Sequence, residues 1–472
     1  MSAHGTNLAN APEIEYMIAK VLIKDFELLR KYKWHTQETA KEQDTILCTL
    51  LALRLTCKHL EKAQIIKACV FKEVAFIASF SQLERLRFPR ESALVSIAPF
   101  VRKVKFLPSP FNLDLDPVFF AQLTNGLLEH LPDLPLRSKR HVDTYWGGVI
   151  PVSHPDIMEC WGDYQEKAQD DHNYLLSGVL QSLWTAGLFL LTQANHFELA
   201  SMHGRHPLVP SYDIEGPDVC KTCTGCRCRL NDLSQLGNYE LFRTAIQCLA
   251  PLQHFRPIQS LSISSELAAA VPEWRDMLWV DLDVGQVRSL SLPSCAYWDE
   301  EFDRLARGQA IENALVQVLQ KPFPALQRLE IAHSVAIPLV QWPPQQHPTF
   351  PSLRLLQLHG LQLRLWPLAA IMASSPALKT IIISDCTPHT NNAMTDGWRL
   401  LYDALRMHQN AYNMHLIFNE VWHKFEMLSF IFGRSTFDPN AQNLSPDYRK
   451  LFMYLAGLGQ WDNTLHQWFE ML

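Results

Sequence analysis

Apolar residues follow two different patterns along the chain, and the change between these patterns divides it into parts. Between residues 13 and 29, and again between residues 50 and 60, apolar residues recur at three- and four-residue spacing, which predicts two amphipathic helices. Beyond about residue 75, short strand-like runs alternate with short helical runs. We therefore expect a small helical module over residues 1–75 and an α/β region after it.

One motif recurs in the α/β region: an apolar residue followed by apolar residues three and five positions later. Its clearest copies begin at Leu326, Leu353 and Leu378, and a proline lies two residues before each of them. Further copies begin at Val101, Ala194, Ile258 and Val287. The clear copies lie 27 and 25 residues apart, within the period of about 20–29 residues that is typical of leucine-rich repeats. This spacing predicts an irregular leucine-rich-repeat solenoid, in which each unit adds one strand to a parallel sheet.

The position eight residues after the first apolar residue completes the motif. Cys386 has this position after Leu378, and Cys295 has it after Val287. Repeats of this kind place Asn or Cys there. Because the chain turns away from the strand at this point, we expect a small side chain that bonds backbone groups.

The array should extend over residues 76–444 and contain two insertions. The segments at about residues 135–173 and 201–237 are rich in polar residues, Pro and Gly, so we expect long inserted loops there. The run Ser445-Pro446-Asp447 is typical of a helix start. Residues 445–472 therefore predict a helical cap, which would cover the apolar surface at the open end of the array.

The composition narrows the classes of partner. The chain is 47% apolar and 19% charged, which is ordinary for a globular protein. Its net charge of −6 gives no electrostatic footprint for nucleic acid, so we expect no nucleic-acid partner. The longest charge-poor stretch, residues 175–191, is interrupted by polar residues and is too short for a membrane span, so no membrane partner is expected either.

Cysteine usage and the first residues bear on the compartment. Residues 1–10 are polar and contain no apolar stretch of the kind that a secretory signal needs. The chain has 11 cysteines, an odd number. We therefore expect reduced thiols and a cytoplasmic or nuclear location.

The order of these parts resembles that of the F-box proteins with leucine-rich repeats, in particular the divergent set found in filamentous fungi. The run from Ala11 to Ile14 (APEI) is similar to the start of an F-box, and the run from Leu50 to Leu60 (LLALRLTCKHL) is similar to its later helix. An insertion over about residues 25–44 separates the two halves, where the ordinary motif has only a short connection.

The resemblance implies a partner for the N-terminal module. An F-box binds a Skp-family adaptor of a cullin-based ubiquitin ligase, while the repeats select a protein substrate, here unknown. The residues that would contact the adaptor are Pro12, Ile14, Ile18, Leu53, Leu55, Cys57 and Leu60. The same apolar side chains can instead pack on each other as an internal helical cap. In that alternative the protein is a repeat scaffold with a decayed F-box and no ligase link.

The strand face of the array is the expected substrate surface. Residues that lie between the apolar anchors of the three clear repeats should alternate with the core and face outward. These residues are Gln327, Arg328, Glu330, Arg354, Gln357 and Lys379. We expect the substrate to bind over them.

A cluster of cysteines offers the one candidate cofactor site. Cys220, Cys223, Cys226 and Cys228 lie within nine residues of sequence. Cys-x-x-Cys pairs suit tetrahedral zinc, so a structural zinc ion that orders this insertion is one hypothesis, and a loop with free thiols is the other. The usual catalytic motifs do not occur in the sequence. We therefore expect a binding protein without enzymatic activity, and a metal-dependent enzyme of unknown type is the remaining alternative.

Overall fold

A computed structural model gives the fold of the chain, and its described residues fall into separate ranges. These are residues 19–24, 45–46, 49–50, 52, 64–79, 93–109, 155–200, 235–264, 279, 282–293, 314–338, 349–388, 394–423, 426–439 and 444–471.

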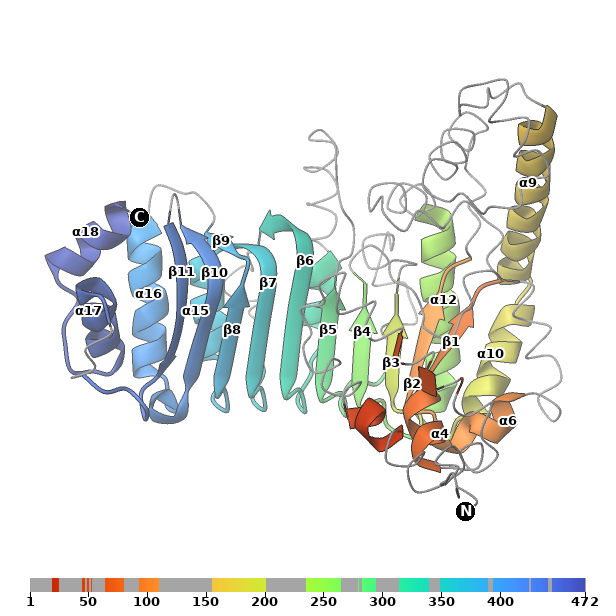
Figure 1. The fold of residues 1–472 in the computed structure, drawn as a ribbon, viewed down its shortest axis with the longest axis horizontal. Coiled ribbons are helices and arrows are strands. Elements are labelled where there is room, and N and C mark those ends of the chain that lie inside the picture. Colours follow the sequence, from red (N-terminus) through yellow and green to blue (C-terminus); the bar gives the residue numbers. More distant parts are fainter. Residues whose placement is uncertain are drawn as a thin grey trace, which may run out of the picture.

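One long sheet organises the described part of the chain (Figure 1). Its strands are β1 (Glu73–Ile77), β2 (Lys103–Leu107), β3 (His196–Leu199), β4 (Ser260–Ile263), β5 (Ser289–Pro293), β6 (Arg328–Pro338), β7 (Leu355–Leu363), β8 (Thr380–Ser384), β9 (Thr387–Pro388), β10 (His415–His423) and β11 (Glu426–Gly433). Ten of them follow one another in the sheet in chain order, and β9 pairs beside this path with the end of β7. All pairs are parallel except β10 with β11. The fold is therefore α/β with an open, mostly parallel sheet.

Helices fill many of the connections between strands (Figure 1). They are α4 (Gln64–Val70), α6 (Ala93–Ile97), α9 (Pro155–Leu176), α10 (Val179–Leu190), α12 (Gln235–Leu252), α15 (Leu365–Ala373), α16 (Met394–Met407), α17 (Pro446–Leu455) and α18 (Asn463–Met471), with short 3-10 turns at Ala98–Phe100 and Ala411–Asn413. Residues 314–320 are helical as well. Ser445 caps α17, since its hydroxyl accepts a hydrogen bond from the Tyr448 amide.

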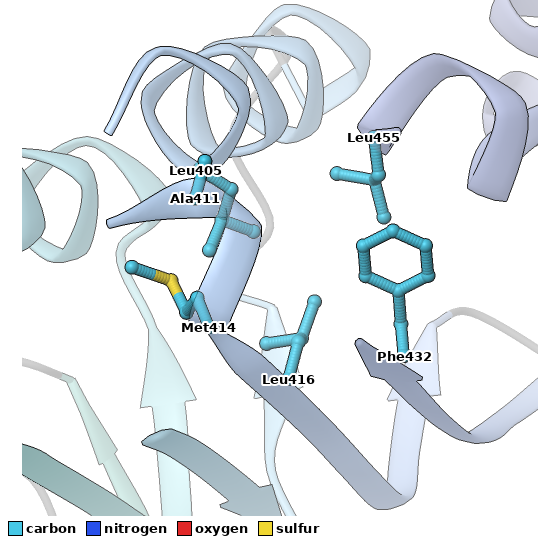
Figure 2. A pocket seen from close by; sticks show the side chains of 6 residues that line it. All are labelled: Leu405, Ala411, Met414, Leu416, Phe432 and Leu455. Carbon is cyan, nitrogen blue, oxygen red and sulfur yellow. The ribbon is translucent and has the colours of Figure 1, made fainter. Parts of the chain in front are cut away.

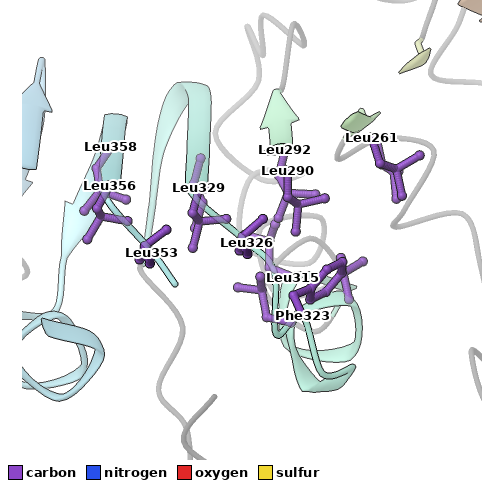
Figure 3. Packing of buried hydrophobic residues seen from close by; sticks show 14 of the residues in the cluster. Leu261, Leu290, Leu292, Leu315, Phe323, Leu326, Leu329, Leu353, Leu356 and Leu358 are labelled. Atoms are coloured by element: carbon purple, nitrogen blue, oxygen red, sulfur yellow. The ribbon is translucent and has the colours of Figure 1, made fainter. Parts of the chain in front are cut away.

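One face of the sheet is buried because apolar side chains alternate along every parallel strand. A row of Cα partners crosses eight strands and is at most 2% exposed: Val104, Phe197, Leu261, Leu290, Leu329, Leu356, Ile381 and Leu416. Figure 3 shows several of these leucines stacked from strand to strand. All seven copies of the sequence motif have their three apolar residues in this core. We call these residues the anchors.

The helices pack on the anchor face. Trp184 of α10 is fully buried against Phe106 of β2, with ring centroids 5.2 Å apart. Side chains of α10, α12, α15 and α16 join the anchors in one continuous apolar cluster. The two C-terminal helices close its end: Phe469 of α18 stacks on Trp398 of α16 at 5.7 Å.

Helix α9 corrects one expectation. We expected an inserted loop over residues 135–173, yet residues 155–173 belong to this helix of 22 residues. Its buried stripe is narrow and consists of Tyr164, Ala168, Asp171 and Leu175. The polar Asp171 interrupts the apolar period, and Ser109 satisfies it by donating a hydrogen bond to its carboxylate. The sequence therefore lacked the apolar signal of a helix.

Two further boundaries differ from the expected ones. Strand β1 begins at Glu73, so the sheet starts three residues inside the expected helical module of residues 1–75. Helix α12 begins at Gln235, inside the expected loop of residues 201–237. The other residues of that loop, 201–234, lie outside the described residues. Among the helices that the structure describes, none combines the length and the apolar content needed to cross a bilayer.

Candidate interaction surface

The side chains that alternate with the anchors form the second face of the sheet, which we call the outer face. One register row crosses it from β2 to β11: Lys105, Glu198, Ser262, Ser291, Glu330, Gln357, Ile382, Ile417 and Ile431. The chemistry changes along this row. Charged residues come first, followed by small hydroxyl residues, then polar residues and finally isoleucines.

The charged end of the outer face is neutralised internally. Lys105 Nζ lies 2.8 Å from Glu73 Oε1, and Lys103 Nζ lies 3.5 Å from the other oxygen of the same carboxylate. Both lysines also pair with Glu198. Burial alone would raise the pKa of Glu198, but Lys105 and Lys103 outweigh that effect and lower it. Because each charge already has partners, this end offers a bound protein little free charge.

The polar centre contains three of the predicted substrate-binding residues. Arg328 Nη2 donates to Gln357 Oε1 at 3.2 Å and lies 3.4 Å from Glu330 Oε2. Gln357 and Glu330 are buried, while the Arg328 side chain is 35% exposed. The guanidinium is therefore held in place and remains open to a partner on one side.

The other three predicted residues lie just before the strands and not within them. Gln327, Arg354 and Lys379 each stand one residue before a strand, two positions before an anchor. Each of them also follows directly after a buried anchor, and Arg354 and Lys379 are exposed. Their backbones link neighbouring units there: the Arg354 amide donates to Gln327 O at 2.8 Å, and the Lys379 amide to Arg354 O at 2.9 Å.

Three neighbouring strands share a left-handed residue at one register position. Ser384 pairs with His359 on one side and with Asn419 on the other. The next residues, Gly360, Asp385 and Glu420, have φ of 65°, 50° and 56°. Glycine adopts this conformation without strain, whereas Asp and above all Glu do so only when the surroundings impose it.

A β-bulge places Glu420 on the outer face. In the pairing of β10 with β11, Phe418 faces Phe430 and Val421 faces Leu428, so two residues of β10 oppose Ser429 alone. The Glu420 amide donates to Ser429 Oγ at 2.9 Å. Because of the extra residue, Glu420 and Asn419 are both exposed and Val421 returns to the core.

The two acidic residues of this register lie together. A hydrogen bond between the carboxyl groups of Asp385 and Glu420 raises the pKa of Glu420, and the charge of Asp385 adds to the effect. His359 Nδ1 lies 3.0 Å from Asp385 Oδ2. Burial lowers the pKa of His359, although Glu330 and the Ser384 backbone oppose this shift. The cluster therefore brings two carboxyl groups and one imidazole together.

A groove of about 470 Å³ lies beside this acidic cluster. We call it the isoleucine groove; its lining includes Ile382, Ser384, Ile417, Asn419, Ser429 and Ile431. Ile431 is 73% exposed. The Ser384 hydroxyl is buried and has no hydrogen-bond partner among the described residues. Ile382 and Ile417 are half-buried. An exposed isoleucine next to an unsatisfied buried hydroxyl is costly for a protein alone.

A second cavity, on the anchor side, has a different character (Figure 2). Its lining is entirely apolar: Leu405, Ala411, Met414, Leu416, Phe432 and Leu455. Its volume is about 10 Å³, close to the smallest space that can hold one water molecule. It is a packing void between α16, β10, β11 and α17.

Cys386 has the backbone-bonding position that the sequence predicts for it. Its Sγ accepts a hydrogen bond from the Leu361 amide at 3.4 Å and donates to Ser384 O at 3.1 Å. Leu361 belongs to β7, so the thiol joins neighbouring strands at the point where the chain turns. Burial raises the pKa of Cys386 to about 12.

Sequence reasoning missed the isoleucine groove and the acidic cluster. A signal was present in the triplet Ile381-Ile382-Ile383, since its middle residue must point away from two core neighbours in a strand. The same holds for Ile417, which lies between the buried Leu416 and Phe418.

The other predicted site residues lie outside the described residues. These are Pro12, Ile14, Ile18, Leu53, Leu55, Cys57 and Leu60 of the F-box-like module, and Cys220, Cys223, Cys226 and Cys228 of the cysteine cluster. Within the described ranges, no three His, Cys, Asp or Glu side chains are grouped so that they could hold a metal ion. No protein-family model matches the chain, and no curated protein matches it in sequence.

Proposed function

We propose that this chain is a protein-interaction module that binds a partner protein on the outer face of its sheet. In this proposal it is the substrate-recognition adaptor of a cullin-based ubiquitin ligase, and the N-terminal module binds the Skp-family adaptor. The observation that carries the interaction role is the continuous row on the outer face, whose chemistry changes from charged to apolar over nine strands. Such a row can recognise an extended protein surface one strand at a time.

The proposal includes a leucine-rich-repeat architecture. Three observations support it. The strands follow chain order and are parallel except for β11. Each copy of the motif supplies two anchors within one of seven strands and a third two residues before it, and Cys386 bonds the backbone of the neighbouring unit. In a repeat protein of this kind each unit contacts mainly its neighbours, which leaves a long strand surface available for partners. The units here are irregular in length, because long insertions separate several of them.

The ligase link depends on the resemblance of the N-terminal segment to an F-box. We would co-express the full chain with a Skp-family adaptor and analyse the pair by size-exclusion chromatography. An Ile18→Asp, Leu55→Asp double variant is the control, since both changes place a charge in the apolar face that an adaptor would cover. We expect co-elution that the double variant abolishes. A monodisperse, folded wild-type chain that elutes alone would remove the ligase link and leave a repeat scaffold.

The outer face offers its own matched pair of variants. Arg328 lies on the outer face, whereas Arg354 is an exposed residue directly before β7. Proteins would be crosslinked to the chain in cells and identified by mass spectrometry. We expect Arg328→Ala to lose specific crosslinked proteins that Arg354→Ala retains. If both variants keep the same crosslinked proteins, the outer face is not the partner surface.

A further inference from the structure

The isoleucine groove has the features of a site for a particular class of peptide, and three of them point to a ligand. The first is the aliphatic row Ile382, Ile417 and Ile431, which are Cα partners across β8, β10 and β11. Single aliphatic side chains on a sheet surface are ordinary. Here the third member of the row, Ile431, is 73% exposed and leaves apolar surface in water. An aliphatic side chain of a partner would cover this row.

The second feature is the hydroxyl of Ser384 in the groove wall. The residue is 1% exposed, and its Oγ has no hydrogen-bond partner among the described residues. Buried polar side chains almost always have such a partner, because losing water without replacement is unfavourable. A peptide backbone that lies in the groove can supply the missing hydrogen bond.

The third feature is the negative charge at one end of the groove. Asp385 and Glu420 follow directly after the lining residues Ser384 and Asn419, and the Asp385 amide donates to Asn419 O at 3.0 Å. Their two left-handed backbones and the bulge at Glu420 hold the carboxyl groups side by side. His359 contacts Asp385, and its pKa is lowered by burial, so this imidazole is mainly neutral at neutral pH. A cation of a partner would relieve their repulsion.

The spacing of these features defines the ligand. Glu420 lies three residues beyond Ile417 along β10, with the bulge between them, so the two backbones are separated by at most about 10 Å. In an extended peptide, side chains two positions apart share a face and are separated by about 7 Å, and the length of an arginine or lysine side chain covers the remaining distance. We propose that the isoleucine groove binds an extended segment of a partner protein in which an aliphatic residue is followed two positions later by arginine or lysine. This rests on the proposed function, and it assigns a substrate class to one end of the outer face.

The test uses the full chain and labelled, end-capped heptapeptides. The probe peptide is GSITRSG, and its two comparison peptides are GSITESG, which reverses the charge, and GSSTRSG, which removes the aliphatic residue. Binding is measured by fluorescence anisotropy at low and at high salt. We expect GSITRSG to bind about tenfold or more tightly than either comparison peptide, and we expect high salt to weaken it. Equal affinity for GSITESG, or no binding of GSITRSG to the folded chain, would overturn the proposal.

Variants of the chain locate the bound peptide. The double variant Asp385→Asn, Glu420→Gln removes the negative charge, and Ile417→Asp disrupts the aliphatic row. Each should weaken GSITRSG binding about tenfold or more. The matched control is Asp163→Asn, Glu166→Gln on the exposed side of α9, which removes the same charge at the other end of the molecule (Figure 1). Thermal melting checks that every variant folds. If Ile417→Asp does not fold, the double variant Asp385→Asn, Glu420→Gln decides the outcome. Unchanged affinity in the folded charge variant contradicts the proposal.

The peptide-binding test and the adaptor co-elution test can fail independently of each other. Peptide binding is measured on the chain alone, so it does not depend on a Skp-family adaptor. Adaptor co-elution without peptide binding would overturn the groove proposal only. Peptide binding without adaptor co-elution would remove the ligase link and leave the groove proposal standing.

Discussion

At the residue scale, several polar side chains of this fold join neighbouring units. Cys386 bonds the backbone of β7 and Asn195 Nδ2 donates to Gln259 Oε1 of the next unit at 3.0 Å. His408 Nε2 lies 3.0 Å from Ser375 O, which connects the segment after α16 with the segment after α15. Each contact links units that are distant in sequence, and each would leave a buried group unsatisfied if it were removed.

Two thiols are fully buried among the described residues, and both should be chemically inert in the folded protein. Burial raises the pKa of Cys248 and of Cys386 to about 12. At pH 8 the thiolate fraction of such a group is about 10⁻⁴, and the thiolate is the form that reacts. We expect iodoacetamide to leave both residues unmodified in the native chain and to modify both in urea, as mapped by mass spectrometry. Modification of either residue before unfolding would contradict the structure at that position.

The ion network of Glu198 should make stability depend on pH in a defined direction. Lys105 and Lys103 lower the pKa of Glu198 in the folded state. Its contribution is therefore present above the unfolded pKa, for which the ordinary value is 4.5, and is lost as pH falls through the folded pKa. We expect Glu198→Gln to lower the urea midpoint at pH 7 and the difference from the wild type to shrink below about pH 4.5.

The control for this prediction is Glu166→Gln on the exposed surface of α9. Its urea midpoint should follow that of the wild type at both pH values. A Glu198→Gln effect that persisted unchanged at low pH would show that packing, and not charge, is what the variant loses.

At the scale of elements, the strands could be predicted from the sequence and the local irregularities could not. The spacing of anchors such as Leu329, Leu356 and Ile381 can be recognised from the sequence alone. The order of the motif copies along the chain is also the order of the strands in the sheet. The bulge at Glu420 arises from the pairing of β10 with β11, so no spacing in β10 alone reveals it. The isoleucine groove was missed because an isoleucine such as Ile382 looks like a core residue in the sequence.

Glycine at the bulge gives a direct test of the strain that we describe. Glu420 has φ of 56°, a conformation that glycine adopts freely. We expect Glu420→Gly to be at least as stable as the wild type in urea unfolding, although it removes a side chain. Lys379→Gly, at an exposed position directly before β8 whose φ is not positive, is the comparison and should lose stability. Destabilisation of Glu420→Gly by about 1 kcal/mol or more would mean that the bulge backbone is unstrained.

At the scale of the whole molecule, one apolar cluster runs from Phe76 in β1 to Phe469 in α18. Its C-terminal end is aromatic: Phe469 lies 5.7 Å from Trp398, 5.5 Å from Trp461 and 4.8 Å from Trp468 between ring centroids. Through these contacts α18 closes the end of the cluster, and Phe452 of α17 packs on Phe432 of β11 with ring centroids 5.2 Å apart (Figure 1).

Loss of one ring from this closing cluster should destabilise the protein. Phe469 is 1% exposed, and truncating a buried Phe to Ala costs about 3–5 kcal/mol. We expect Phe469→Ala to lower the free energy of unfolding by an amount in that range in urea titrations. Phe255→Ala is the matched control, because Phe255 is 74% exposed and surface changes have effects of about 0.5 kcal/mol. Equal effects of the two substitutions would mean that the C-terminal helices do not close the core.

The agreement of strand order with chain order has a consequence for how the protein is made. Each parallel strand leaves the ribosome after its earlier neighbour in the sheet, so a newly made strand finds its partner already available and need not wait for later sequence. The growing sheet then carries one advancing edge of unpaired backbone groups, which is also the surface most prone to pair with other chains. Synthesis of β11 reverses the strand direction at that edge, and α17 and α18 follow it. A nascent chain stalled before this point would be the form most in need of a chaperone.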